Sequence, residues 1–140
     1  MAHAARFRAR ACAARVYRGC VNDFRRLIVW QRAHEATLET YKGTSSFPAC
    51  ERFGLVTQMR RAAASVAANI AESCGRGTAR DEARFLHVAA GSARELEYHA
   101  LLARDLGLLS PEGYERLNHL VVETQRMLAA LLRRVPRPPR

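Results

Sequence analysis

The sequence predicts an all-α protein that folds as an up-down-up-down antiparallel four-helix bundle. Four separate segments carry apolar residues at every third or fourth position, which is the period of an amphipathic helix. No segment sustains the alternation of apolar and polar residues that is typical of a half-buried strand. Capping and helix-stopping residues flank the four segments, and the linkers are short, so we expect consecutive helices to be antiparallel neighbours.

The first predicted helix opens at Asn22-Asp23, which are favoured N-cap residues, and ends near Gly43. Its large apolar and aromatic side chains recur with spacings of 3, 4, 4 and 3, so we expect this face to pack against the rest of the bundle. The residues of this face are Leu27, Trp30, His34, Leu38 and Tyr41. On this interpretation His34 is a core or interface histidine rather than a metal ligand.

The second predicted helix follows a loop at 44–48, where Pro48 suits the first turn of the next element, and it ends at Gly75. The alanines of this segment leave room for a neighbouring helix to approach closely. Its predicted core positions are Leu55, Met59, Ala63, Val66 and Ile70.

The third predicted helix begins at a capping box, 78–81, in which Asp81 stands where Glu or Gln is usual, and Gly107 ends it. Its apolar positions alternate in steps of three and four. They are Leu86, Ala89, Ala93, Leu96, Ala100 and Ala103.

The fourth predicted helix begins with Ser110 as N-cap and Pro111 in the first turn, and Pro136 stops it. Its apolar seam contains one polar member, Thr124. The seam comprises Tyr114, Leu117, Val121, Thr124, Leu128, Leu131 and Val135.

Composition limits the protein class. A chain of 140 residues that is 49% hydrophobic can bury one core, and its uncharged stretches are too short to span a bilayer. The first residues are rich in arginine and lack the apolar segment of a secretory signal. The four cysteines show no metal-ligand spacing and are expected to be reduced thiols, so we expect a cytoplasmic protein without a membrane partner. They are Cys12, Cys20, Cys50 and Cys74.

The chain is predicted to contain three parts. Residues 1–22 hold five arginines and no acidic residue, and we expect an arginine-rich, disordered extension there. Residues 23–135 form the bundle, and 136–140 form a tail rich in proline and arginine. Most of the net charge of +10 therefore falls on the two ends of the chain.

The predicted topology brings basic residues together at one end of the bundle, which we name the basic pole. The start of the first helix, the corner between the second and third, and the end of the fourth share this end. It contains the candidate nucleic-acid-binding residues Arg25, Arg26, Arg76, Arg80, Arg84, Arg133 and Arg134.

Four acidic residues accompany these seven arginines, whereas the opposite pole carries a slight negative excess. We expect phosphate binding without base-specific readout, because the basic pole carries little aromatic content beyond Tyr17. The alternative explanation for the positive charge of the basic pole is a composition that is rich in arginine throughout, with Lys42 as the only lysine.

The motifs do not predict an enzyme, a metal site or a cofactor. Cys74 lies at a helix C-terminus, where the helix dipole disfavours a thiolate, and no histidine is near it in sequence. The acid–histidine pairs at 95–99 and 115–119 lack the spacing of a di-metal bundle. Gly75 and Gly77 are expected to give the corner between the second and third predicted helices a left-handed or tight turn. Asn69 is expected to have a structural role.

Six stretches of the chain carry a family resemblance through their order and spacing. They are LIVWQRAHE at 27–35, FPACERFGL at 47–55, QMRRAA at 58–63, NIAE at 69–72, GRG at 75–77 and GSARELE at 91–97. With them, the chain from about Phe24 to Leu132 resembles the four-helix-bundle family of 23S ribosomal RNA intervening-sequence proteins. That family includes the accessory variability protein of diversity-generating retroelements. Ser73-Cys74 departs from the family pattern, in which a glycine is usual.

The resemblance implies a cytosolic, ring-shaped homopentamer without known enzymatic activity, and the retroelement member binds a reverse transcriptase and nucleic acid. Apolar residues beside the core seams also favour a closed oligomer, because monomers rarely leave a large apolar patch exposed. These residues are Phe85, Val88, Leu102, Leu120 and Met127.

Two functional hypotheses follow. The first is a non-enzymatic, oligomeric protein that binds nucleic acid through the basic pole, as an accessory to a reverse transcriptase. The second is an oligomeric scaffold that binds a protein partner without nucleic acid. Salt-dependent nucleic-acid binding distinguishes them.

Overall fold

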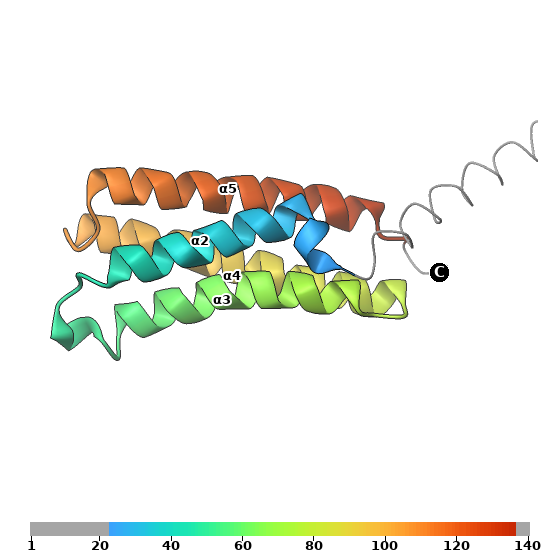
Figure 1. Cartoon of the computed structure of the whole chain (residues 1–140), viewed down its shortest axis with the longest axis horizontal. Helices are drawn as coiled ribbons and strands as arrows, with labels where there is room; N and C mark the ends of the chain where they lie inside the picture. The colour runs from blue at the N-terminus through green and yellow to red at the C-terminus, as the bar shows by residue number, and fades with distance from the viewer. Residues whose placement is uncertain (1–22, 137–140) are drawn as a thin grey trace, which may run out of the picture.

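The computed structural model describes residues 23–136, and this part of the chain contains helices and no strand (Figure 1). The predicted extension at 1–22 and residues 137–140 of the predicted tail lie outside the described residues. None of the described helices is long and apolar enough to cross a membrane. The elements are η1 (Phe24–Arg26), α2 (Ile28–Thr44), η2 (Ala49–Glu51), α3 (Leu55–Cys74), α4 (Ala79–Asp105) and α5 (Pro111–Arg134).

The four long helices form an antiparallel bundle with up-down-up-down connections, as predicted (Figure 1). Helices α2 and α4 each pack against both α3 and α5. Within the described part of the chain, α2 and α4 do not contact each other and lie diagonally across the bundle. Because both begin at the basic pole, their chains run in the same direction (Figure 1).

The predicted core faces of α3, α4 and α5 are confirmed. Met59 and Ile70 on α3 are fully buried, and all six predicted positions of α4 are buried. On α5 the buried face runs from Tyr114 to Leu128, while Leu131 is half-buried. Burial of each large aliphatic side chain contributes roughly 1.5–3 kcal/mol, which holds the helices together.

The predicted core face of the first helix is confirmed only near its start, where Leu27 and Trp30 pack against the core, and is wrong along the rest of α2. Leu38 and Tyr41 are 57% and 48% exposed, His34 is also exposed, and Trp30 is half-buried. The face that packs inward is instead built from small and β-branched residues. It comprises Val29, Ala33, Ala36, Thr40 and Thr44.

Two threonines can occupy this inward face because their own helix satisfies their hydroxyls. Thr40 donates to the carbonyl of Ala36, and Thr44 donates to the carbonyl of Thr40, both at 2.7 Å. A buried hydroxyl with such a partner avoids the cost of an unpaired polar group.

The start of the first helix also differs from the prediction. Asp23 caps the short η1 through the backbone N–H of Arg25, and α2 begins only after an extended residue, Leu27. The later caps follow the sequence: Thr78 accepts from the N–H of Asp81, and Ser110 accepts from the N–H of Gly113.

Of the left-handed or tight turn predicted for the α3–α4 corner, the left-handed form is absent, and the backbone N–H groups of Gly75 and Arg76 instead close turns onto Glu72 and Ser73. Gly75 caps α3 with φ of −89°, and Gly77 has no positive φ either. Within residues 23–136 the left-handed glycine is Gly107, with φ of +71°, after α4. A side chain at this φ would be strained, which explains glycine at the α4–α5 corner.

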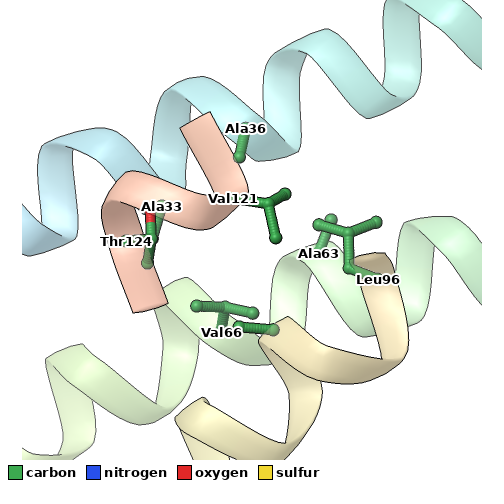
Figure 2. A pocket seen from close by; sticks show the side chains of 8 residues that line it. Ala33, Ala36, Ala63, Val66, Leu96, Val121 and Thr124 are labelled. Carbon is green, nitrogen blue, oxygen red and sulfur yellow. The ribbon is translucent and has the colours of Figure 1, made fainter. Parts of the chain in front are cut away.

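The centre of the bundle contains a cavity of about 10 Å³ (Figure 2). This volume is about that of one water-sized site and leaves no room for an organic ligand. All four long helices contribute to the wall of this cavity, so its lining residues lie at about the same height along the bundle axis. The lining residues are Ala33, Ala36, Ala63, Val66, Ala93, Leu96, Val121 and Thr124.

Candidate nucleic-acid interface

The fold brings the seven predicted arginines to one end of the molecule. The η1 segment, the α3–α4 corner and the C-terminal end of α5 all lie at this end, on the right in Figure 1. The pole is held by a core cluster that joins Val29 near the start of α2, Leu86 near the start of α4 and Val135 after α5. All seven arginines are exposed. The seven arginines of the basic pole therefore lie on the solvent-exposed surface at this end of the bundle.

At the α3–α4 corner, two arginines lie over one aromatic ring. The guanidinium of Arg76 is 4.4 Å from the ring centroid of Phe85, and that of Arg84 is 4.7 Å from it. Such cation–π contacts hold a guanidinium at a defined place while leaving its N–H donors available. Arg76 is also paired with Glu72 on α3. The corner thus presents two positioned cations, with Arg80 exposed one turn before Arg84 on α4.

A second aromatic group lies at the start of α2. The guanidinium of Arg25 is 5.0 Å from the ring of Phe24, which meets Trp30 edge-on at 4.9 Å. Trp30 in turn stacks on His34, with ring centroids 4.9 Å apart and an interplanar angle of 9°. The prediction that the pole carries little aromatic content is therefore wrong. Aromatic faces of this kind can stack on nucleobases.

Two of the seven arginines at the basic pole are held in ion pairs, although four acidic residues lie at this pole. Asp23 pairs with Arg25 at 3.3 Å, and Glu72 pairs with Arg76. Asp81 accepts a hydrogen bond from the Thr78 hydroxyl as part of the α4 cap. Across residues 23–136, no carboxylate lies within ion-pair distance of the remaining five arginines. They are Arg26, Arg80, Arg84, Arg133 and Arg134.

The opposite pole differs because Lys42, Arg104 and Arg116 have carboxylate partners there. Arg116 on α5 reaches Glu39 on α2 at 3.5 Å, and Lys42 reaches the same carboxylate at 3.5 Å. Arg104 pairs with Asp105 at 3.0 Å. The charge asymmetry predicted along the bundle axis is thus present in the ion pairs as well as in the sequence.

The other candidate residues are structural in this arrangement. Cys74 is half-buried, and burial, with a smaller contribution from Glu82, raises the pKa of its thiol. Asn69 donates to the carbonyl of Ser65 in its own helix at 2.8 Å. The contact that crosses from α3 to α4 is instead between the hydroxyls of Ser65 and Ser92, also at 2.8 Å. Residues 23–136 contain no group of three or more His, Cys, Asp or Glu side chains placed to hold a metal.

The sequence-based prediction missed the role of Phe85 and misjudged the apolar patches. Phe85, predicted to lie on an oligomer surface, is half-buried, and its ring supports two arginines. Leu102, Leu120 and Met127 pack against the core clusters of the same chain, and only Val88 of that set is exposed, at 47%. The adjacency of Phe85 to Arg84 was the one available signal for a cation–π contact.

Comparisons with known proteins agree with this fold. A profile of the family described as 23S rRNA-intervening sequence protein matches residues 25–130, from η1 to near the end of α5. The chain belongs to this family. Among curated proteins, none matches the chain.

A solved structure extends the comparison to three dimensions. It is a protein of unknown function from the S23 ribosomal protein family of Bacteroides thetaiotaomicron, with 24% sequence identity and a TM-score of 0.68. The alignment covers 75% of this chain and 98% of that one. At this identity the likeness shows a shared fold and leaves function to be argued from the surface.

Proposed function

We propose that this member of the 23S rRNA-intervening sequence protein family is a non-enzymatic, self-associating cytoplasmic protein that binds nucleic acid through its basic pole. The observation that carries the proposal is the group of five exposed arginines without a carboxylate partner in the described part of the chain. A surface of unpaired guanidinium groups attracts a phosphate backbone and releases its counterions.

The geometry of the corner supports phosphate as the bound group. Arg76 and Arg84 approach one ring, so each is restrained before binding. A guanidinium carries a planar fork of donors that matches phosphate oxygens, and prior restraint lowers the entropy lost on binding. Phosphate contacts alone carry no sequence information, so binding is expected to tolerate many sequences.

Self-association would increase this binding. The resemblance to the family implies a ring-shaped homopentamer, and a ring with parallel subunit axes places every basic pole on the same side. One polyanion can then touch several poles, and the linked contacts add avidity to weak individual ones. An accessory role beside a reverse transcriptase, as implied for the retroelement member, is part of this proposal.

The direct test is a salt titration of binding to labelled single-stranded RNA, single-stranded DNA and duplex DNA. If about five phosphates are neutralised, log affinity for duplex DNA should fall with log salt at a slope of about −4 to −5. Absence of binding to all three at low salt would contradict the proposal. Co-purification of nucleic acid with the native protein would support it.

The alternative function is a scaffold for a protein partner. The observation that favours it is Phe53, which is 87% exposed in the loop before α3, with the Arg52 guanidinium 5.4 Å from its ring. An exposed aromatic beside an arginine is typical of a residue that anchors a protein interface. Pull-down with the native protein should then recover a partner that Phe53→Ser no longer binds, while nucleic-acid binding is absent.

A further inference from the structure

Aromatic side chains line one side of α2, beginning at the basic pole. Trp30, His34 and Tyr41 follow one another at intervals of four and seven residues, which places them on one face of the helix; we name them the aromatic row. Thr37 belongs to the same face and donates to the carbonyl of Ala63 on α3 at 3.1 Å, so the row lies along the side of α2 that is next to α3. Two of its members, His34 and Tyr41, are exposed.

Two rings of the row already form a stack. The indole of Trp30 and the imidazole of His34 are nearly parallel, with an interplanar angle of 9° and centroids 4.9 Å apart. Phe24 meets the indole edge-on at the same distance. Among residues 23–136, no second ring lies against the imidazole of His34 from its other side. A planar aromatic group can therefore extend the stack on the open face of His34.

Cations lie at both ends of the aromatic row. Arg25 and Arg26 of the basic pole come directly before α2, and the guanidinium of Arg25 is 5.0 Å from the ring of Phe24. At the far end, the guanidinium of Arg60 on α3 is 4.5 Å from the ring of Tyr41. The positions of the row's face, 30, 34, 37 and 41, include no acidic residue. This combination of rings and flanking cations suits a ligand in which planar bases alternate with phosphates.

We propose that the aromatic row is a stacking site for unpaired nucleobases, with a base on the open face of His34 and phosphates of the same strand on Arg25 and Arg26. The inference rests on the nucleic-acid binding proposed above and names the form of the ligand, a single strand. In a duplex each base is paired and stacked between its neighbours, so its face is not available to a side chain. Every base has such a face, so the site tolerates many sequences.

The distance along the helix permits one strand to reach both groups. From Ile28, the first residue of α2, to His34 the axial rise is about 9 Å, which about three nucleotides of a stacked strand span at about 3.4 Å each. Aromatic side chains also attract protein partners, but the seven exposed arginines of the neighbouring pole favour a polyanion. Charge and reach thus agree on a single strand that begins at the basic pole and continues along α2.

The test compares four labelled probes of equal length by fluorescence anisotropy: oligothymidine, oligouridine, an abasic strand and a duplex. His34→Ala should lower the affinity for oligothymidine or oligouridine about 5- to 150-fold, which is the effect of one lost base–aromatic stack. Its affinity for the abasic strand and the duplex should not change. His34→Tyr should restore single-strand binding because it restores a ring. The matched control is His87→Ala, which removes an exposed histidine of α4 at the same pole.

A second measurement uses the wild-type protein alone. A strand that carries 5-iodouracil forms photocrosslinks with aromatic rings on which the base stacks. Trypsin divides the aromatic row between the peptides 27–32 and 33–42, so mass spectrometry separates a crosslink at Trp30 from one at His34. We expect the crosslink on 33–42, at His34. The strand with the higher affinity, oligouridine or oligothymidine, identifies RNA or DNA as the source of the bases.

Two results would overturn the inference. One is equal affinity of the wild-type protein for oligothymidine, oligouridine and the abasic strand. The other is unchanged single-strand binding by His34→Ala, which would leave the row to a protein partner. Both leave phosphate binding at the basic pole intact, whereas failure of all four probes to bind at low salt would contradict the proposed function itself. Circular dichroism verifies that the variants are folded, and the crosslink does not depend on any variant.

Discussion

The guanidinium of Arg76 lies 4.4 Å from the ring centroid of Phe85, across the corner between α3 and α4. Arg84 approaches the same ring at 4.7 Å. These contacts join the end of one helix to the start of the next and keep two cations close together on an exposed surface. Coulomb repulsion between them is offset by the ring and by Glu72, which pairs with Arg76.

The first prediction concerns this ring. Phe85→Leu keeps the net charge but removes the aromatic face, so both guanidinium groups lose their restraint. Two cation–π contacts at exposed sites contribute about 0.5–1 kcal/mol each, so loss of both should lower the affinity for nucleic acid about 5- to 30-fold. Fluorescence anisotropy with a labelled oligonucleotide measures the change. The matched control is Phe53→Leu, which removes the ring beneath Arg52 at the opposite pole and should leave affinity unchanged.

The second prediction concerns the core. Leu117 and Leu128 are 2% and 0% exposed on α5, so Leu117→Ala or Leu128→Ala should each lower the free energy of unfolding by about 2–5 kcal/mol. Chemical denaturation followed by circular dichroism gives the value. Losses below about 0.5 kcal/mol at both sites would place this face of α5 on the surface and contradict the fold.

The third prediction separates two buried threonines by their partners. Thr124 donates only to the Leu120 carbonyl in its own helix, at 2.7 Å, so Thr124→Val strands no group and should change stability by less than about 1 kcal/mol. The hydroxyl of Thr44 also accepts from the guanidinium Nε of Arg60 at 2.9 Å. Thr44→Val should therefore cost about 1–3 kcal/mol, because a partly buried donor loses its acceptor. Equal effects in denaturation would show that the Arg60 contact contributes nothing.

The fourth prediction concerns thiol reactivity. Burial raises the pKa of the Cys74 thiol, so its reactive thiolate forms only at higher pH than in an ordinary cysteine. Iodoacetamide labelling read by peptide mass spectrometry should therefore be much slower at Cys74 than at the exposed Cys50 near neutral pH. The folded state also keeps a proton that the unfolded chain loses, so this thiol lowers stability as pH rises above the ordinary thiol pKa. Rapid labelling of Cys74 at neutral pH would show that the site is open.

Comparison of α4 with α2 shows which parts of the fold could be predicted. On α4 the large aliphatic residues and alanines share one face, so the periodicity of the sequence identified all six core positions. On α2 the inward face is made of small and β-branched residues, while Leu38 and Tyr41 point outward. Side-chain size and hydrophobicity therefore indicated the wrong side of α2. The two threonines can face inward because the hydroxyls of Thr40 and Thr44 are satisfied within the helix.

The candidate site could likewise be predicted only in part. Helix direction and caps follow from local sequence, so the gathering of arginines at one pole could be predicted. The contacts of Phe85 and the stacking of Trp30 on His34 depend on side-chain positions across a corner and along an exposed face. Periodicity does not determine such positions, so these aromatic residues could not be assigned before the structure.

The last prediction tests whether the basic pole, rather than total charge, binds nucleic acid. Replacement of Arg76, Arg80 and Arg84 together by Gln should weaken binding and reduce the salt slope on duplex DNA by about 2 to 3, because each lost phosphate contact contributes about 0.9. The control replaces Arg104 and Arg116 by Gln; both arginines have carboxylate partners at the opposite pole. The slope of this control should change little.

Light scattering should show the same mass for the wild-type protein and both variants, because all five arginines are exposed and none contributes to the core. If each arginine removed lowered affinity equally at both poles, only net charge would matter and the basic pole would have no special role. A large loss confined to the variant at 76, 80 and 84 would instead assign binding to the α3–α4 corner, where Phe85 holds two of these three side chains in place before the phosphate arrives.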